Sequence, residues 1–405
     1  MKDIENSRKE SPFLGLTGMG GGVNSLMWTG ASVVNGLLWM VGEADRGQLD
    51  NNISEIGGGA TSVDKSSPIQ VGTENTWSKI GVGNVFAAAT KTDGTMWSWG
   101  NQSRGGLGLN EGSALYRSSP CQIGGADNWS DIFIGRAMCL ATRTNNTLWS
   151  WGYNSPGGQL GLNDETARSS PTQIPGTTWT QPRNGGNHIG ASGCLRTDNS
   201  LWTWGDNEGG RLGHNNTTNY SSPRQLPGTW ADFDVCGGDA NINAMIGVKT
   251  NGELWTWGYS EDGALGLNEG DVTYSSPKQV GTDTTWATGA HSVAMGAGHS
   301  FGIKTDGSLW AWGRNTYAAL GTPGNVARSS PIQVGTDTNW SQVHCKESSV
   351  AAIRTNGQLW VWGRNNRGQL GLGSASEPPG PRQYGTSQKY FTEVAVAAEF
   401  LGTIT

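Results

Sequence analysis

Charged residues are scarce in this sequence. Asp, Glu, Lys and Arg make up 15% of its 405 residues, where about 25% is usual in soluble domains. The 27 basic and 33 acidic residues give a net charge of −6. Salt-dependent binding to phosphates needs a clustered basic surface, so this composition argues against nucleic acid as a partner.

Long apolar runs are also missing. No stretch approaches the ~18 consecutive apolar residues of a membrane-spanning helix, which predicts no membrane insertion. The first ten residues contain no apolar core of the kind that a secretion signal requires. We therefore expect a soluble chain that is made in the cytosol.

Cysteine and histidine offer no recognisable site. The Cys residues are odd in number and never spaced as Cys-x-x-Cys, so we expect reduced, buried thiols instead of disulfides or a zinc site. The His residues lack metal-binding spacings, and no Gly-x-Ser-x-Gly elbow is present. The sequence therefore predicts no catalytic centre, no metal and no cofactor. The Cys residues are Cys121, Cys139, Cys194, Cys236 and Cys345.

Glycine and tryptophan, by contrast, are abundant. The chain has 64 Gly and 20 Trp but only 15 Pro, and it has no Gly-X-Y period, which excludes collagen-like and Pro-rich disordered chains. So many Trp residues also exclude general disorder. This composition predicts many short strands joined by tight turns.

A Trp-x-Trp-Gly motif recurs about every 53 residues, and such a period indicates a repeat array. Chain length alone would suggest two or three domains. An Asp-Gly or Asn-Gly hairpin turn precedes the motif in five copies, and Gly-x-Leu-Gly and Ser-Ser-Pro follow it. The motif begins at Trp97, Trp149, Trp202, Trp255, Trp310 and Trp360, with a weaker copy at Trp39.

Seven units of four short strands predict an all-β fold, a seven-bladed β-propeller over residues 31–405. The last copy stops at Thr405, before its hairpin turn, whereas the first recognisable turn is Asn35-Gly36. We therefore predict one shared closing blade, with inner strands from the carboxyl end and outer strands from about Val33 onward. Residues 1–30 would form a leader or docking segment, and Trp28 is assigned to neither part.

The Trp pairs are expected to hold neighbouring blades together. A strand period of two places both Trp residues of a pair on one face, and each buried Trp hides about 150–250 Å². Sugar binding by exposed aromatic faces is the alternative.

Two sets of cations are the candidate ligand-binding residues. The first lies two residues before each turn pair, and a propeller would arrange it as a ring on one face that focuses an anionic partner. Local neutralisation is the other interpretation, since Asp93, Asp198 and Asp306 lie two residues away. The first set is Lys91, Arg143, Arg196, Lys249, Lys304 and Arg354, and the second, in loops after the Trp pairs, is Arg104, Arg314, Arg364 and Arg367.

The pattern hairpin-Leu-Trp-x-Trp-Gly-x-Asn-x-x-Gly-x-Leu-Gly, best seen at 298–321 and 358–373, resembles the regulator of chromosome condensation repeat family. The resemblance implies the seven-bladed propeller and the shared blade, but no single activity. The repeated Arg-Ser-Ser-Pro and Gly-Thr-x-x-Trp segments are most similar to bacterial and bacteriophage members. The family's exchange factors use a strand-pair wedge, whereas the over-long interval from Trp39 to Trp97 carries Gly57-Gly58-Gly59.

Taken together, these observations predict a non-enzymatic propeller that binds protein partners. We expect a bacteriophage virion or bacterial surface-recognition component, docked onto its assembly through residues 1–30, with a cell-surface ligand as a further partner. Such a protein would be found on the virion or cell surface, and otherwise in the cytoplasm. The alternatives are an intracellular GTPase regulator of the nucleotide-exchange type and an inhibitor of a secreted enzyme.

Overall fold

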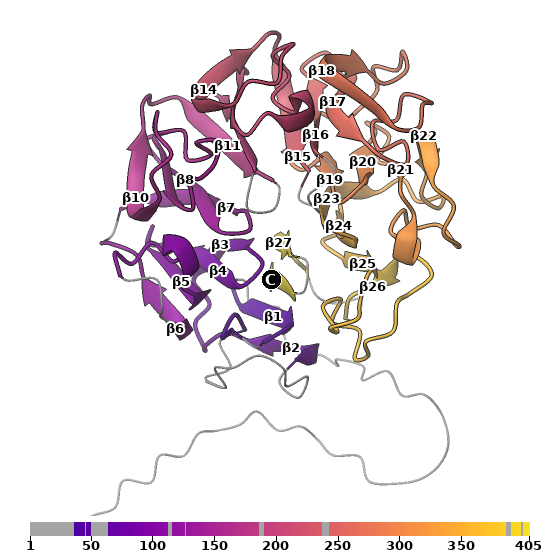
Figure 1. Cartoon of the computed structure of the whole chain (residues 1–405). Helices are drawn as coiled ribbons and strands as arrows, with labels where there is room; N and C mark the ends of the chain where they lie inside the picture. The colour runs from indigo at the N-terminus through magenta and orange to yellow at the C-terminus, as the bar shows by residue number, and fades with distance from the viewer. Residues whose placement is uncertain are drawn as a thin grey trace, which may run out of the picture.

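The computed structural model describes residues 36–44, 46–49, 64–111, 116–125, 127–185, 190–236, 243–385, 390–397 and 400–405. In these ranges the chain forms seven antiparallel four-stranded sheets, arranged as blades around a central axis (Figure 1). No helix of the described ranges is long and apolar enough to cross a membrane. The expected leader 1–30, Trp28 and the Gly57-Gly58-Gly59 stretch lie outside the described residues.

Strands are lettered A to D in each blade, from the axis outward, and the six blades built from continuous sequence are numbered in chain order. Blade 1 has β3 (Trp77–Val82), β4 (Phe86–Lys91), β5 (Met96–Asn101) and β6 (Tyr116–Gln122). Blade 2 has β7 (Trp129–Ile134), β8 (Met138–Arg143), β9 (Leu148–Gly152) and β10 (Arg168–Ile174). Blade 3 has β11 (Trp179–Asn184), β12 (Ala191–Arg196), β13 (Leu201–Gly205) and β14 (Tyr220–Leu226).

The remaining blades follow the same order. Blade 4 has β15 (Trp230–Val235), β16 (Asn243–Lys249), β17 (Leu254–Ser260) and β18 (Val272–Gln279). Blade 5 has β19 (Val293–Met295), β20 (His299–Ile303), β21 (Leu309–Gly313) and β22 (Arg328–Gln333). Blade 6 has β23 (Trp340–Lys346), β24 (Ser349–Arg354), β25 (Leu359–Gly363) and β26 (Arg382–Gln383). Short 3₁₀ turns follow strand C at η1 (Ser103–Gly105), η2 (Glu208–Gly210) and η3 (Thr316–Ala318).

The closing blade is shared between the two ends of the chain, as predicted. Its strands A and B are β27 (Glu393–Val396) and β28 (Phe400–Ile404), and its strands C and D are β1 (Leu38–Gly42) and β2 (Lys65–Gln70). The ends join where β1 pairs with β28, with Trp39 opposite Thr403. The two ends thus complete one sheet, which closes the ring.

The second Trp of each pair connects a blade to the one before it. In six blades this Trp is fully buried. Its Nε1 donates a hydrogen bond to a backbone carbonyl in the preceding blade's loop after strand C, as from Trp312 to Ala264 at 2.9 Å. The last Gly of the Gly-x-Leu-Gly turn is required here, because Gly266 has φ +70° and a Cβ there would lie 2.7 Å from Nε1 of Trp312. The other bonds join Trp99 to Gln48, Trp151 to Gly106, Trp204 to Gln159, Trp257 to Arg211 and Trp362 to Ala319.

The Trp pairs were expected to hold neighbouring blades together, but the first Trp of each pair is only half-buried. It lies next to the hairpin turn, and in blades 1 to 5 its Nε1 bonds to the side chain two residues before it, as from Trp310 to Ser308 Oγ at 2.9 Å. Only one Trp of each pair therefore acts as the full inter-blade contact. All five Cys residues are free, and three are buried, while Cys121 and Cys345 are half-buried.

Candidate binding faces

The alternating strand directions give the ring two loop-bearing faces. The loops that join A to B and C to D lie at one end of the strands, called here the C–D face. The turns that join B to C and the loops that lead from D into the next blade lie at the other end, the B–C face. The two sets of predicted cations fall on opposite faces.

The first set lies along the B–C face, where the cation is the last residue of strand B in five blades and, as Lys304, directly follows strand B in blade 5. Each one is placed over two indole rings of its own blade. Lys91 Nζ, for example, is 4.8 Å from the ring centroid of Trp77 and 4.2 Å from that of Trp97. Over all six blades these distances run from 3.7 to 5.8 Å, within the range of an attractive cation–π contact.

Carboxylates also neutralise most of these cations, but they are not the ones the sequence suggested. Lys304 pairs with Asp283, which lies in the loop that enters its blade, at 2.6 Å. Its hydrogen bond to Asp283 is the main cause that lowers the pKa of that carboxyl to about 2. Asp306 instead caps the hairpin turn, since its Oδ1 accepts bonds from Ser308 N at 2.9 Å and Oγ at 2.6 Å. The other pairs are Lys91 with Glu74, Arg143 with Asp127, Lys249 with Glu253 and Arg354 with Asp337.

Arg196 is the exception, because no carboxylate of the described residues lies within 4.0 Å of it. It keeps the aromatic contacts, 4.2 Å from the centroid of Trp179 and 4.0 Å from that of Trp202. The ring of cations is thus held locally by aromatic and acidic neighbours. That it also binds an anionic partner stays a prediction.

The second set lies on the C–D face, and three of its four members contact a neighbouring blade, whereas Arg364 pairs within blade 6. Arg314 of blade 5 bonds to Glu261 at 2.8 Å and Asp262 at 2.7 Å, both in blade 4. Arg104 of blade 1 stacks on the ring of Tyr153 in blade 2, 4.1 Å from its centroid. Arg364 pairs with Glu347 at 3.0 Å, and Arg367 lies 3.6 Å from Glu43 and 3.6 Å from Asp64 of the shared blade.

The C–D face also carries a residue that the sequence analysis missed. The middle residue of each 3₁₀ turn has left-handed backbone, with φ of 60° at Arg104, 67° at Gly209 and 62° at Tyr317. A side chain with a Cβ is strained there by about 1–2 kcal/mol, which Gly avoids. Tyr317 is nevertheless 39% exposed, and Val326 in the same loop is 59% exposed.

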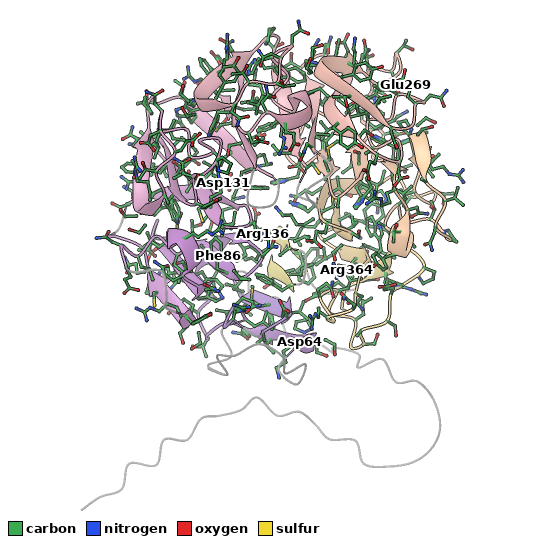
Figure 2. The ribbon with its side chains drawn as sticks, viewed as in Figure 1. Asp64, Phe86, Asp131, Arg136, Glu269 and Arg364 are labelled. Carbon is green, nitrogen blue, oxygen red and sulfur yellow. The ribbon has the colours of Figure 1, made fainter. Side chains whose placement is uncertain are left out.

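The sequence signal for Tyr317 was a bulky aromatic at a loop position that other copies fill with Gly, Asp or Arg. Figure 2 shows how the side chains are distributed, with Arg136 toward the centre of the ring and Glu269 at its outer rim. Among the described residues, no group of three His, Cys, Asp or Glu side chains is placed to hold a metal ion.

Comparisons with known proteins support the repeat assignment. The profile described as Regulator of chromosome condensation (RCC1) repeat matches residues 198–238, 251–303, 306–353 and 356–402. A second profile with the same description matches residues 290–318 and 340–369.

Two curated relatives are 26% identical to the chain. The E3 ubiquitin-protein ligase HERC2 of Homo sapiens aligns over 60% of this chain, which spans only 5% of that protein. The Ultraviolet-B receptor UVR8 of Arabidopsis thaliana aligns over 75% of this chain and 67% of its own length.

Two solved structures share the fold. Human WBSCR16 superposes with a TM-score of 0.74 at 20% identity, over 91% of this chain and 99% of that one. Prp20p of Saccharomyces cerevisiae, studied for its binding to Gsp1p and histones, superposes with a TM-score of 0.76 at 18% identity, over 93% and 92%.

Proposed function

Because the chain belongs to the regulator of chromosome condensation repeat family, we propose that it is a propeller that binds other proteins without catalysis and that its C–D face forms the binding surface. Tyr317 carries this proposal. An exposed aromatic side chain on left-handed backbone adds strain and leaves apolar surface in water. A contact with a partner would bury this apolar surface and offset the strain.

The neighbouring chemistry supports the same face. Tyr and Arg are enriched at the centres of protein interfaces, because they combine a large contact area with directed hydrogen bonds. Arg104 occupies the same strained position in blade 1 that Tyr317 occupies in blade 5. On the B–C face, the six cations make cation–π contacts with indole rings and, in five blades, ion pairs with carboxylates. The Arg residues of the C–D face are paired or stacked as well, so it is the exposed Tyr317 and Val326 that make this face the better candidate.

The test measures partner binding after substitutions on the two faces. Tyr317→Gly restores the residue best suited to the left-handed backbone, so the loop is expected to keep its shape while binding weakens by about tenfold or more. Thr305→Ala is the matched control, since Thr305 is exposed in the B–C turn of the same blade. If both variants bind a partner from the source cells as tightly as the parent does, the C–D face is not the binding surface.

We propose that the setting is a bacteriophage virion or a bacterial surface, where residues 1–30 dock the propeller onto a larger assembly. The apolar, Gly-rich segment Ser11-Pro12-Phe13-Leu14-Gly15-Leu16 supports the docking idea. A chain that starts at residue 31 is expected to fold but to be absent from purified particles. Normal incorporation of that chain would reject docking through residues 1–30, and accelerated nucleotide release from a small GTPase would favour an exchange factor instead.

A further inference from the structure

The innermost strands of all seven blades surround a cavity of about 70 Å³ on the ring axis. One water needs about 10–15 Å³ of such space, so the cavity has room for a ligand of only a few non-hydrogen atoms. Charged side chains line it, among them Asp131 of β7, Arg183 of β11, Asp234 of β15 and Lys346 of β23. Figure 2 shows Asp131 on the inner side of its blade.

Arg183 is a buried cation that lacks a carboxylate partner. Its residue is 4% exposed, yet no carboxylate of the described residues lies within 4.0 Å of the guanidinium. Nη1 donates to the carbonyl of Pro182 at 2.9 Å, and Nη2 donates to His291 Nδ1 at 3.2 Å. Because a guanidinium only donates, His291 accepts through Nδ1 and is therefore neutral. Most of the hydrogen-bonding capacity of Arg183 is therefore not used by the described residues.

Lys346 repeats this situation on the other side of the cavity. It is 6% exposed, and its ammonium has no hydrogen bond or ion pair to any described residue. Burial lowers its pKa, and the nearby Asp234 carboxylate opposes that shift. Lys346 is thus a second cation in this wall without a partner among the described residues. Burying a charged group in this way is costly.

Among the described residues, only backbone N–H groups donate hydrogen bonds to the facing carboxylates. Asp131 accepts the N–H of Ile132 at 2.9 Å, and Asp234 accepts that of Met295 at 2.9 Å. Burial raises the pKa of both carboxyls, to about 6 for Asp234, while the charge of Arg183 opposes the shift. Positive and negative groups thus face the same cavity without closing into ion pairs.

Elsewhere this protein does close its buried ion pairs. Arg211 is 3% exposed and lies 2.7 Å from Asp206. At the edge of the cavity, Lys79 of β3 bonds directly to Glu393 of β27. The open arrangement of Arg183 and Lys346 with Asp131 and Asp234 is therefore a particular property of the axial cavity.

We propose that the axial cavity binds a small zwitterion of the free amino acid class, with its carboxylate at Arg183 and its ammonium at Asp131. An anion alone would face the Asp131 and Asp234 carboxylates, and a cation alone would face Arg183 and Lys346, so both are disfavoured by repulsion. A ligand with both charges supplies the partners that each wall lacks. The charged residues of this site belong to strands A and not to the loops that carry Tyr317, so the site stands independently of the proposed protein partner.

The test is a thermal-shift and calorimetry screen of the full chain against each standard amino acid at millimolar concentration. At least one is expected to bind with a dissociation constant between micromolar and millimolar. Its deaminated acid and its decarboxylated amine are each expected to bind about tenfold more weakly or worse, because each leaves one pair of charges open. If no amino acid binds, or if either analogue binds as tightly as the parent amino acid, the proposal is wrong.

Two variants locate the site. Asp131→Asn and Arg183→Leu are each expected to abolish binding, and Arg314→Gln on the C–D face is the control that retains it. Asp131 is half-buried and its described hydrogen bond is to the next residue, so Asp131→Asn keeps the proposal testable if Arg183→Leu fails to fold. Unchanged binding by Asp131→Asn would overturn the assignment.

Discussion

Replacing Trp257 by Ala should remove one whole contact between blades 3 and 4. Trp257 is fully buried, its ring lies 5.5 Å from that of Trp230, and its Nε1 donates to the carbonyl of Arg211 at 2.8 Å. Truncating a buried Trp to Ala costs about 3–5 kcal/mol through lost contacts and the cavity left behind. Leaving the Arg211 carbonyl buried without a donor adds about 1 kcal/mol. We expect the free energy of unfolding to fall by about 4–6 kcal/mol.

The assay is urea unfolding followed by circular dichroism, with Trp255→Ala as the matched control in the same strand. Trp255 is half-buried, and its Nε1 bonds only to Glu253, at 3.1 Å, so its loss should cost about 2 kcal/mol. Trp257→Phe keeps a ring but loses the N–H. Its loss of free energy of unfolding should therefore lie between those of the two Ala variants. If Trp257→Ala costs no more than Trp255→Ala, the buried indole is not the main connection between the blades.

Three further predictions concern single positions. Burial lowers the pKa of His299 from 6.5 to about 4, so the unfolded chain binds the proton more tightly and stability is lost as pH falls from 6.5 toward 4. His299→Phe removes this group and copies Phe86 at the same position of blade 1. Its free energy of unfolding relative to the parent should therefore rise by about 2 kcal/mol from pH 7 to pH 5, measured by urea unfolding. A difference that does not change with pH would refute the prediction. Tyr317→Gly should unfold within about 1 kcal/mol of the parent, because relief of strain offsets the entropy of Gly, and a larger loss would make Tyr317 structural. Gly266→Ala should cost about 3 kcal/mol or more by thermal unfolding, because its Cβ would meet Trp312, whereas Gly281→Ala, with equal handedness and open space, should cost about 1 kcal/mol; equal costs would contradict the packing argument.

Local signals that recur in every unit were enough to predict the ring. Strand spacing is indicated by the turn pairs, by the Trp motifs and by the position of Pro. Together these signals predict seven blades and a shared closing sheet. The structure starts the outer part of that sheet at Leu38, five residues after Val33. The ends of strands depend on pairing across the sheet, which a single copy does not reveal.

Side-chain partners were harder to predict. The repeat alone placed the six cations at equivalent positions, but in four blades the acid comes from the loop that enters the blade, as Asp283 does for Lys304. Asp306, two residues along the chain from Lys304, is bound to its own turn instead. A carboxylate that is close to a cation in sequence can be bound by another group in the fold. Here the hairpin turn binds the nearer carboxylate, so the cation pairs with a more distant one.

The axial cavity left no periodic trace in the sequence. Its charged residues occupy inner strands at positions where the copies differ, such as Asp131 in blade 2 and Gln181 in blade 3. The position of Arg183, two residues after Gln181, holds Phe133 in blade 2. Only closure of the ring brings these single substitutions to one site, so no repeat pattern could have indicated them.

The most direct test of the binding account is a photo-crosslinking comparison between the two faces. A benzophenone amino acid is placed at position 317 on the C–D face and, in a second protein, at position 305 on the B–C face of the same blade. Exposure in an extract of the source cells should give one specific crosslinked protein from position 317 and none from position 305. The same crosslink from both positions, or one from position 305 alone, would contradict binding through the C–D face.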